Sequence, residues 1–343
     1  MLRQQGDVAA AAGQLRKAVA LSPRLAIAHV QLGVTLQQWG DIEGAVAHLN
    51  TAVALDPSSI DARNSLGLAL IQAGEAAAAV TTLRDLVRDH PEDVTARLNL
   101  GTALLQKADL PAAAAVFTEV LARDPSNALA QYNLGMALKQ QDKFDDAERA
   151  LRRAVELDST LADAPFTLGV VLWQTGRLDE AAAAFRQALS RKESYPDAEY
   201  MLATVLKQQG ATDDAIAHLQ RTVQLQPTMA EAYVSLGQAL QQQGRASEAR
   251  AALEHARTLN QRKADAQAST FAVSVGNQKL KSGDLAGAIG QYRDAIRLAA
   301  DNPQAHYRLA IALVRRGEHS EAQREYETAR GFAPYLQAPA GLR

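Results

Sequence analysis

A period of 34 residues runs through almost the whole of this 343-residue chain and constrains its fold more than any other feature. Pro23, Pro57, Pro91 and Pro125 are each 34 residues apart, and Pro227 lies three further periods along. When each repeat begins three residues after its proline, position 7 is almost always leucine, position 8 small, position 11 leucine, position 20 alanine and position 24 large and apolar. A fixed period of this length is typical of stacked structural repeats.

Each repeat has the pattern of two helices. Positions 7, 8 and 11 lie on one helical face, because side chains three and four residues apart are neighbours there. A glycine near position 15 suits the left-handed conformation that ends a helix. It occurs at Gly40, Gly74, Gly176, Gly210, Gly244, Gly283 and Gly317. Acidic residues such as Asp145 and Asp146 then begin the second helix, at the positive end of its dipole. The pattern predicts a helix A and a helix B in every repeat.

The composition fits an all-α chain whose repeats depend on one another. Hydrophobic residues make up 47% of the sequence but aromatic residues only 5%. A core rich in alanine brings helix backbones close together instead of filling space with large rings. One such helix pair buries too little apolar surface to fold alone, so it must pack against its neighbours. We therefore predict an α-solenoid and not two globular domains.

Charge and residue content exclude several function classes. The 36 Lys and Arg against 38 Asp and Glu give a net charge of −2, which disfavours nonspecific nucleic-acid binding. No run of 18 apolar residues is present, so we expect no membrane span. The absence of cysteine excludes disulfides, thiolate nucleophiles and cysteine-bound zinc. The seven histidines show no metal-ligand spacing, and no phosphate-binding glycine loop occurs. We assign no catalytic residue, metal or cofactor and expect the protein not to be an enzyme.

The repeated residues resemble the tetratricopeptide repeat. In the fifth repeat the pattern reads Leu134, Gly135, Leu138, Ala147, Leu151 and Ala154; in the sixth it reads Leu168, Gly169, Leu172, Gly176, Ala181, Phe185 and Ala188. The resemblance covers one solenoid over residues 1–336: a half repeat (1–25), then repeats 26–59, 60–93, 94–127, 128–161, 162–195, 196–229, 230–268, 269–302 and 303–336, followed by a tail (337–343). The repeat array is most similar to the repeat arm of the O-GlcNAc transferases, but this sequence contains no catalytic domain like theirs. The resemblance implies a right-handed superhelical α-solenoid whose inner groove, lined mainly by helix A, binds peptides or protein segments.

The pattern breaks at four places, one of which is the replacement of the boundary proline by Ser159 and Glu193 around repeat 6. The half repeat lacks most of its helix A, so that its helix B (residues 7–21) has no partner of its own. The tail contains Pro339 and forms no capping helix, so we expect both ends to be uncovered and open to self-association. The interval from Gly244 to Gly283 is 39 residues, five more than the period, and Lys279 stands where leucine belongs. Here helix B either runs on by more than a turn or is followed by a loop. We expect an altered superhelical step and weaker coupling between repeats 2–8 and 9–10.

The residues predicted to face the groove give a candidate partner-binding surface in repeats 5 to 7. It combines aromatic and methionine side chains, which are favoured in binding surfaces, with lysines and amides. Its members are Tyr132, Asn133, Met136, Lys139, Gln140, Phe166, Trp173, Gln174, Tyr200, Met201, Lys207 and Gln208. An equally open interpretation is that position 5, which holds Tyr132, Phe166 and Tyr200, is half-buried between helices.

Glutamine occupies position 13 in eight consecutive repeats, and such a ladder of amides can bind an extended peptide backbone. Its members are Gln4, Gln38, Gln72, Gln106, Gln140, Gln174, Gln208 and Gln242. The alternative, which we favour, is that glutamine is a good helix former at an exposed position copied by repeat duplication.

A second, basic surface is expected near the C-terminal end, from Lys281, Arg308, Arg315 and Arg316. It suits an acidic tail or a carboxylate, or is simply a solvated end. Together these features predict a protein–protein interaction scaffold. The alternative is the substrate-targeting arm of a larger enzyme or of an envelope or secretion complex. We expect a bacterial, cytoplasmic protein, or a periplasmic one if an N-terminal signal has been lost.

Overall fold

The computed structural model describes the backbone of residues 2–342 and the side chains of residues 8–342. That part of the chain is all-helical and divides into two compact units, residues 1–221 and 222–343. The helices of the first unit are α1 (Leu2–Leu21), α2 (Ala26–Trp39), α3 (Ile42–Leu55), α4 (Ile60–Gln72), α5 (Ala76–Asp89), α6 (Val94–Gln106), α7 (Leu110–Arg123), α8 (Ala128–Lys139), α9 (Phe144–Leu157), α10 (Asp163–Gln174), α11 (Leu178–Arg191), α12 (Pro196–Gln208) and α13 (Thr212–Leu225), which ends just past its boundary. The second unit contains α14 (Ala230–Gln242), α15 (Ala246–Lys281), α16 (Leu285–Leu298), α17 (Pro303–Arg316) and α18 (His319–Phe332).

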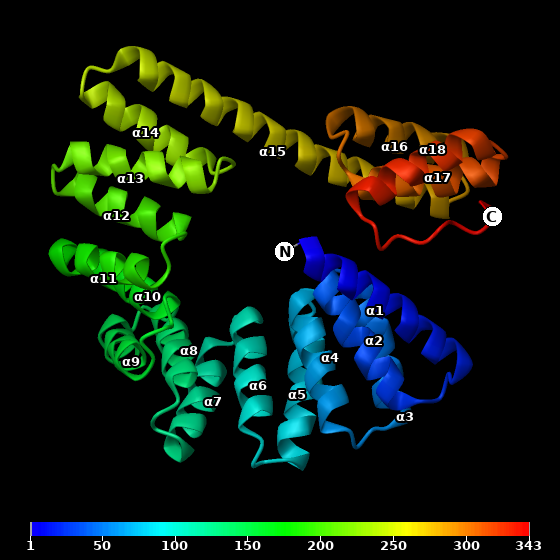
Figure 1. Ribbon diagram of the computed structural model, residues 1–343, viewed down its shortest axis with the longest axis horizontal. Helices are drawn as coiled ribbons and strands as arrows, with labels where there is room; N and C mark the ends of the chain where they lie inside the picture. The colour runs from blue at the N-terminus through cyan, green and yellow to red at the C-terminus, as the bar shows by residue number, and fades with distance from the viewer. Residues whose placement is uncertain (1, 343) are drawn as a thin grey trace. The chain divides into compact units, whose positions relative to one another are not determined.

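Within each unit the helices alternate as A and B and pack on their neighbours in chain order (Figure 1). The predicted α-solenoid of helix-turn-helix repeats is confirmed. Glycine ends helix A as expected: Gly40 has φ 92° and closes α2. Where the glycine is missing, Ala108 (φ 62°) and Asp142 (φ 57°) adopt the same left-handed conformation. The turn is therefore dictated by the repeat, and glycine only makes it less strained.

The small residue at position 8 allows helices A and B to meet. A Cβ placed on Gly101 of α6 would lie 2.4 Å from Cε1 of Phe117 on α7, and one on Gly33 would lie 2.5 Å from Cγ of Leu49. Phe117 and Leu49 are fully buried. The glycine thus leaves the space that the large residue at position 24 fills.

The five extra residues do not form a loop. Helix α15 runs without interruption for 36 residues, joining helix B of repeat 8 to helix A of repeat 9 (Figure 1, yellow). Of the two predicted outcomes, the continued helix is the one observed. None of its residues between Ala256 and Ser269 is buried. The altered superhelical step and the weaker coupling stay predictions.

The two ends differ from expectation. Helix α1 begins at Leu2, five residues before the predicted start of helix B. At the other end the tail folds against the last repeat, although it forms no helix. The Tyr326 hydroxyl donates to the Leu336 carbonyl at 3.2 Å, Pro339 is buried, and Leu342 packs against the core of repeats 9 and 10. The prediction of an uncovered last repeat is wrong, because an extended segment covers it.

None of the helices in residues 2–342 combines the length and the apolar character needed to cross a membrane.

Candidate functional site

The predicted partner-binding surface lies on three consecutive A helices, α8, α10 and α12, all in the first unit. Its aromatic, methionine, lysine and asparagine side chains are half-buried: Tyr132, Asn133, Met136, Lys139, Phe166, Trp173, Tyr200, Met201 and Lys207. Its glutamines, Gln140, Gln174 and Gln208, are exposed. The surface therefore combines partly covered apolar side chains with solvated amides, as a contact surface for another chain would.

Phe166 packs inward. Its ring lies 5.0 Å from that of Tyr195 and 5.8 Å from that of Phe185, measured between centroids. Phe166 and Tyr195 belong to a small core cluster with Ala188 and Ala198, between repeats 6 and 7. Phe166 therefore joins two repeats, in the environment that the half-buried interpretation of position 5 describes.

Tyr195, which sequence reasoning missed, organises the polar side of this cluster. Its hydroxyl donates to Oδ1 of Asp163 at 2.7 Å, and Lys192 Nζ lies 4.5 Å from its ring centroid. Burial, and then the Asp163 carboxylate, raise the pKa of Tyr195 well above its usual range. Burial also raises the pKa of Tyr132, whose hydroxyl forms a hydrogen bond with Thr167. Both tyrosines thus stay neutral at physiological pH.

A pocket of about 660 Å³ lies where the A helices end, and we call it the Trp173 pocket. Its lining residues are Phe144, Trp173, Gln174, Gly176, Leu178 and Gln208. The indole Nε1 of Trp173 donates to Oε1 of Gln208 in the next repeat at 3.0 Å. Three predicted site residues thus meet here. Phe144 and Leu178 were missed; both occupy position 17, where an apolar residue directly before the acidic start of helix B gave the signal.

The glutamine ladder has a partly structural explanation. The glutamines at position 13 are exposed from Gln38 to Gln242, while the side chain of Gln4 lies outside the described residues. Gln106 Nε2 donates to the Ile71 carbonyl at 2.8 Å, and Gln208 accepts from Trp173. Both bonds link position 13 to position 12 of the preceding helix A. At these two positions the amide ties neighbouring repeats together.

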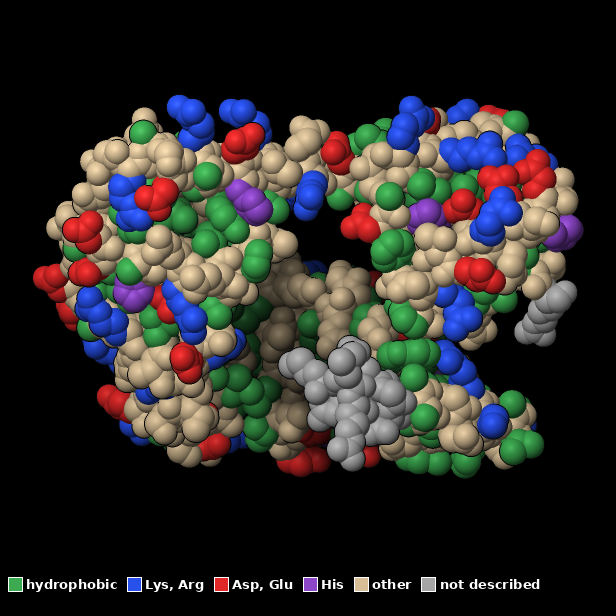
Figure 2. All heavy atoms as spheres, turned by 45° about the horizontal axis from the view of Figure 1, so that its top comes forward, with side chains coloured by type: hydrophobic (Ala, Val, Ile, Leu, Met, Phe, Trp, Pro, Cys, Tyr) green, Lys and Arg blue, Asp and Glu red, His purple; other side chains and the backbone are tan. Residues whose placement is uncertain are grey.

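The predicted basic surface is only partly assembled. Arg316 pairs with Glu318 at 2.6 Å, and this contact raises the pKa of Arg316. Arg308 and Arg315 both act electrostatically on the buried Tyr292, whereas Lys281 is an exposed residue at the end of α15. On the face shown in Figure 2, acidic and basic side chains are interspersed. The charge of Arg316 is therefore partly neutralised by its partner Glu318.

Three pairs of ionisable side chains recur at positions 4 and 23, nineteen residues apart. They are His29 with His48 (3.1 Å between Nδ1 atoms), Glu199 with His218 (2.5 Å) and His306 with Glu325 (2.5 Å). The repeat geometry joins helices A and B at these positions, which the spacing along the sequence does not show. Among the described side chains no three metal-binding groups lie together.

Comparisons with known proteins agree with this architecture. The stacked helix pairs define a tetratricopeptide repeat array, and residues 38–74 and 276–317 match the TPR repeat model. Residues 58–272, more than half of the chain, match the model described as the cilia and flagella-associated protein 70 C-terminal domain. The chain belongs to that family of tetratricopeptide repeat domains. Such proteins generally mediate protein–protein interactions and are generally not enzymes.

Solved structures show the same fold. A tetratricopeptide repeat protein from Parabacteroides merdae is 17% identical, with a TM-score of 0.53 over 68% of this chain and 93% of that one. PilF of Pseudomonas aeruginosa is 20% identical, with a TM-score of 0.51 over 59% and 92%. MamA is 29% identical over 48% of this chain and 96% of its own, with a TM-score of 0.46. No match is found among curated proteins. The likeness to O-GlcNAc transferases, the bacterial origin and the compartment stay predictions.

Proposed function

We propose that the protein is a non-enzymatic scaffold that holds an extended peptide or protein segment along the A helices of its first unit. The observation that carries the proposal is the Trp173 pocket, because residues from three repeats meet there around one indole. Phe144, Trp173 and Leu178 give the pocket apolar walls, while Gln174 and Gln208 supply amides at its rim.

This combination suits one apolar side chain of an extended segment. The side chain would be covered by the indole, and the neighbouring backbone would bond to the glutamine amides, which both donate and accept. The adjacent half-buried methionines, Met136 and Met201, extend the apolar surface along α8 and α12 and adapt readily to different partners.

The proposal is tested with peptides selected from a random phage-displayed library against the full chain. Trp39→Phe leaves Trp173 as the only tryptophan, because the chain has two. Selected peptides should then shift the Trp173 emission to shorter wavelength and share an apolar residue. Trp173→Ala should weaken their binding by at least about tenfold, which corresponds to about 1.4 kcal/mol.

Trp39→Phe is itself the matched control, and it should leave the affinity unchanged. Circular dichroism confirms that each variant keeps its helices. Peptides that bind the Trp173→Ala variant as tightly as the unmodified chain would show that the site lies elsewhere, and a library without binders would contradict the peptide-holding function.

A further inference from the structure

Position 24 is covered in every full repeat but one. Its side chain is 0% exposed in repeats 2 to 6 and in repeat 9, and at most 7% exposed in repeats 7 and 10. In repeat 8 it is Leu253, which is 37% exposed. The glycine beneath it, Gly237, is the normal one, with a Cβ position 2.6 Å from Leu253 Cγ. Leu253 is therefore seated normally on its own helix A but lacks the cover that its counterparts have.

Position 3 shows the complementary anomaly. It is alanine, at most 7% exposed, in eight repeats: Ala28, Ala62, Ala96, Ala130, Ala164, Ala198, Ala232 and Ala305. In repeat 9 it is Phe271, which is 72% exposed. A position that otherwise carries a small buried side chain here presents an aromatic ring to solvent.

The continuous α15 explains both. In a regular repeat, helix A of the next repeat folds back on helix B, as α4 does on α3 and α17 on α16. In α15 these two elements are one straight helix, so they cannot cover each other. Repeat 8 is left with an open face that normally receives a helix A, and repeat 9 with an open helix A face that normally docks on a helix B.

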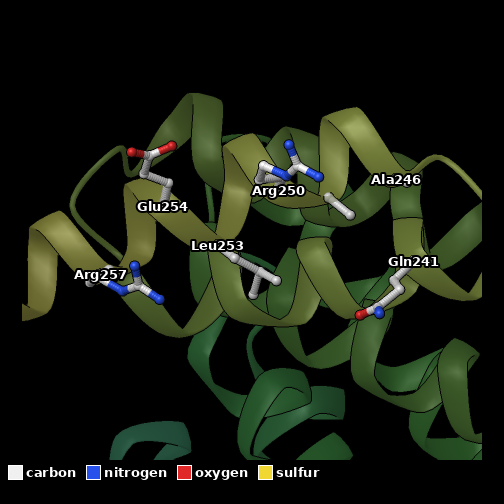
Figure 3. Close-up of a pocket in the computed structure, with 7 residues that line it drawn as sticks. Gln241, Ala246, Arg250, Leu253, Glu254 and Arg257 are labelled. Atoms are coloured by element: carbon white, nitrogen blue, oxygen red, sulfur yellow. The ribbon is translucent and has the colours of Figure 1, made fainter.

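The open face of repeat 8 is hollowed. A pocket of about 480 Å³ is lined by Gln241 of α14 and by Ala246, Ala249, Arg250, Leu253, Glu254 and Arg257 of α15. Figure 3 shows Leu253 between Arg250 and Arg257 along the helix, with Gln241 facing it from α14. This is the kind of contiguous apolar surface with a charged rim that marks a docking site.

The two open faces point the same way. Leu253 and Phe271 are 18 residues apart, which is five full turns of an α-helix, so they lie on one side of α15. Consecutive B and A helices in a repeat array run antiparallel. Two copies of α15 laid antiparallel would therefore place the open repeat 8 face of each against the open repeat 9 face of the other.

We propose that this side of α15 is a reciprocal docking surface for a second copy of the same chain, in which each copy supplies the helix A that the other lacks. We expect the occupant to be a helix A, because a helix A covers the equivalent face of helix B in the other repeats of this chain. The exchange is isologous and closes on itself as a twofold dimer.

The regular turn fixes the expected register. In two antiparallel helices, residues that lie equally far from the turn are neighbours. For α3 and α4 this places Leu49 beside Leu66, that is, position 24 beside position 7. Applied across two copies, the same rule sets Leu253 beside Val275 and Arg257 over the ring of Phe271, a cation–π contact. It places the small residue Ala264, which is exposed here, at the twofold axis next to its own copy.

Sedimentation velocity on the full chain tests the association. We expect a species of twice the 36.7 kDa of one chain. Leu253→Asp and Phe271→Asp should each raise the dimer dissociation constant by at least about a hundredfold, because a charge would be buried in the interface. Leu298→Asp is the matched control: Leu298 is 41% exposed in the same unit, and its substitution should leave the dimer intact.

Cysteine cross-linking tests the register independently of stability. The chain has no cysteine, so each introduced thiol is unique. Ala264→Cys should form a covalent dimer under mild oxidation, whereas Arg262→Cys, about 200° away around α15, should not. A monomer at all concentrations, a dimer insensitive to both aspartate substitutions, or equal cross-linking of both cysteine variants would overturn the proposal.

Discussion

The contact between Gly101 and Phe117 allows the packing rule of the repeat to be tested by a double-mutant cycle. In Gly101→Ala the added methyl group would lie 2.4 Å from Cε1 and 2.5 Å from Cζ of the Phe117 ring, about 1 Å too close. The ring is fully buried and has few alternative rotamers, so helices α6 and α7 must separate. Overpacking of this kind costs about 1–3 kcal/mol.

The same substitution also improves helix propensity by about 0.5–1 kcal/mol. The net loss should therefore be about 1–2 kcal/mol. In a Phe117→Ala background the loss should disappear, because the ring that the added methyl group would meet is gone. The gain in helix propensity is the same in both backgrounds, so the expected coupling energy between the two positions is the overpacking cost of about 1–3 kcal/mol.

Hydrogen exchange measured by mass spectrometry is the suitable assay, since unfolding of a repeat array is not a two-state process. Gly101→Ala should reduce the protection of amides in α6 and α7 by about five- to thirtyfold, and amides in α10 and α11 serve as the internal control. If Gly101→Ala is equally harmful with phenylalanine and with alanine at position 117, the small residue does not serve to admit the side chain at position 24.

Two further outcomes are expected. Leu151→Ala should cost about 2–5 kcal/mol of local stability and Leu253→Ala about half as much at concentrations where the chain is monomeric, because Leu151 is 0% and Leu253 37% exposed. Equal losses of hydrogen-exchange protection around the two residues would contradict the uncovered face. The hydrogen bond that His306 donates to the Glu325 carboxylate raises the pKa of His306 above 6.5. The contribution of this bond to stability should therefore be full below pH 6.5 and lost as the pH rises through the folded-state pKa. The free-energy difference between the unmodified chain and His306→Gln should therefore shrink with rising pH, and a difference that grows would refute this sign.

The period predicted the helix pairs because each repeat position carries its own physical role. Leucine at 7 and 11 and the small residue at 8 define the buried face, and glycine near 15 marks the turn. Even the turns without glycine, at Ala108 and Asp142, followed from their position in the period. Fold class and helix boundaries were therefore readable from sequence to within a few residues.

The continued helix α15 was not decided by the period. Gln261 stands at position 32, where six repeats have a proline. Repeats 5, 6 and 9 also lack it, but a proline lies in the first turn of their next helix A (Pro165, Pro196 and Pro303), whereas the stretch between Pro227 and Pro303 contains no proline. Without a proline here, an alanine-rich segment supported by the Gln261–Asp265 hydrogen bond (2.9 Å) remains helical. The sequence left a loop and a continued helix both open, and the lack of any proline near this boundary is the feature that favours the helix.

The candidate site was only partly predictable, because a repeat position does not by itself determine how deeply its side chain is buried. Positions 12 and 13 of the repeat identified Trp173 and Gln208, and the structure joins them through one hydrogen bond. Phe166 looked equivalent but turned inward, because Tyr195 and Phe185 offered it two aromatic neighbours. A repeat position fixes the direction of the backbone, whereas the final burial of a side chain depends on neighbours specific to that repeat.

The regular repeats and the interrupted repeats at α15 expose different surfaces to partners. Where repeats follow one another without a break, each apolar face is covered by the next helix, and the exposed remainder is a row of amides and half-buried rings suited to an extended segment. At α15 the chain exposes Leu253 and Phe271, whose counterparts are buried in the other repeats. Such a face has the shape of an internal repeat contact, so the structure that complements it best is another repeat of the same kind. The two proposed surfaces use different residues, on the A helices of the first unit and on α15 of the second, so substitutions can test each of them separately.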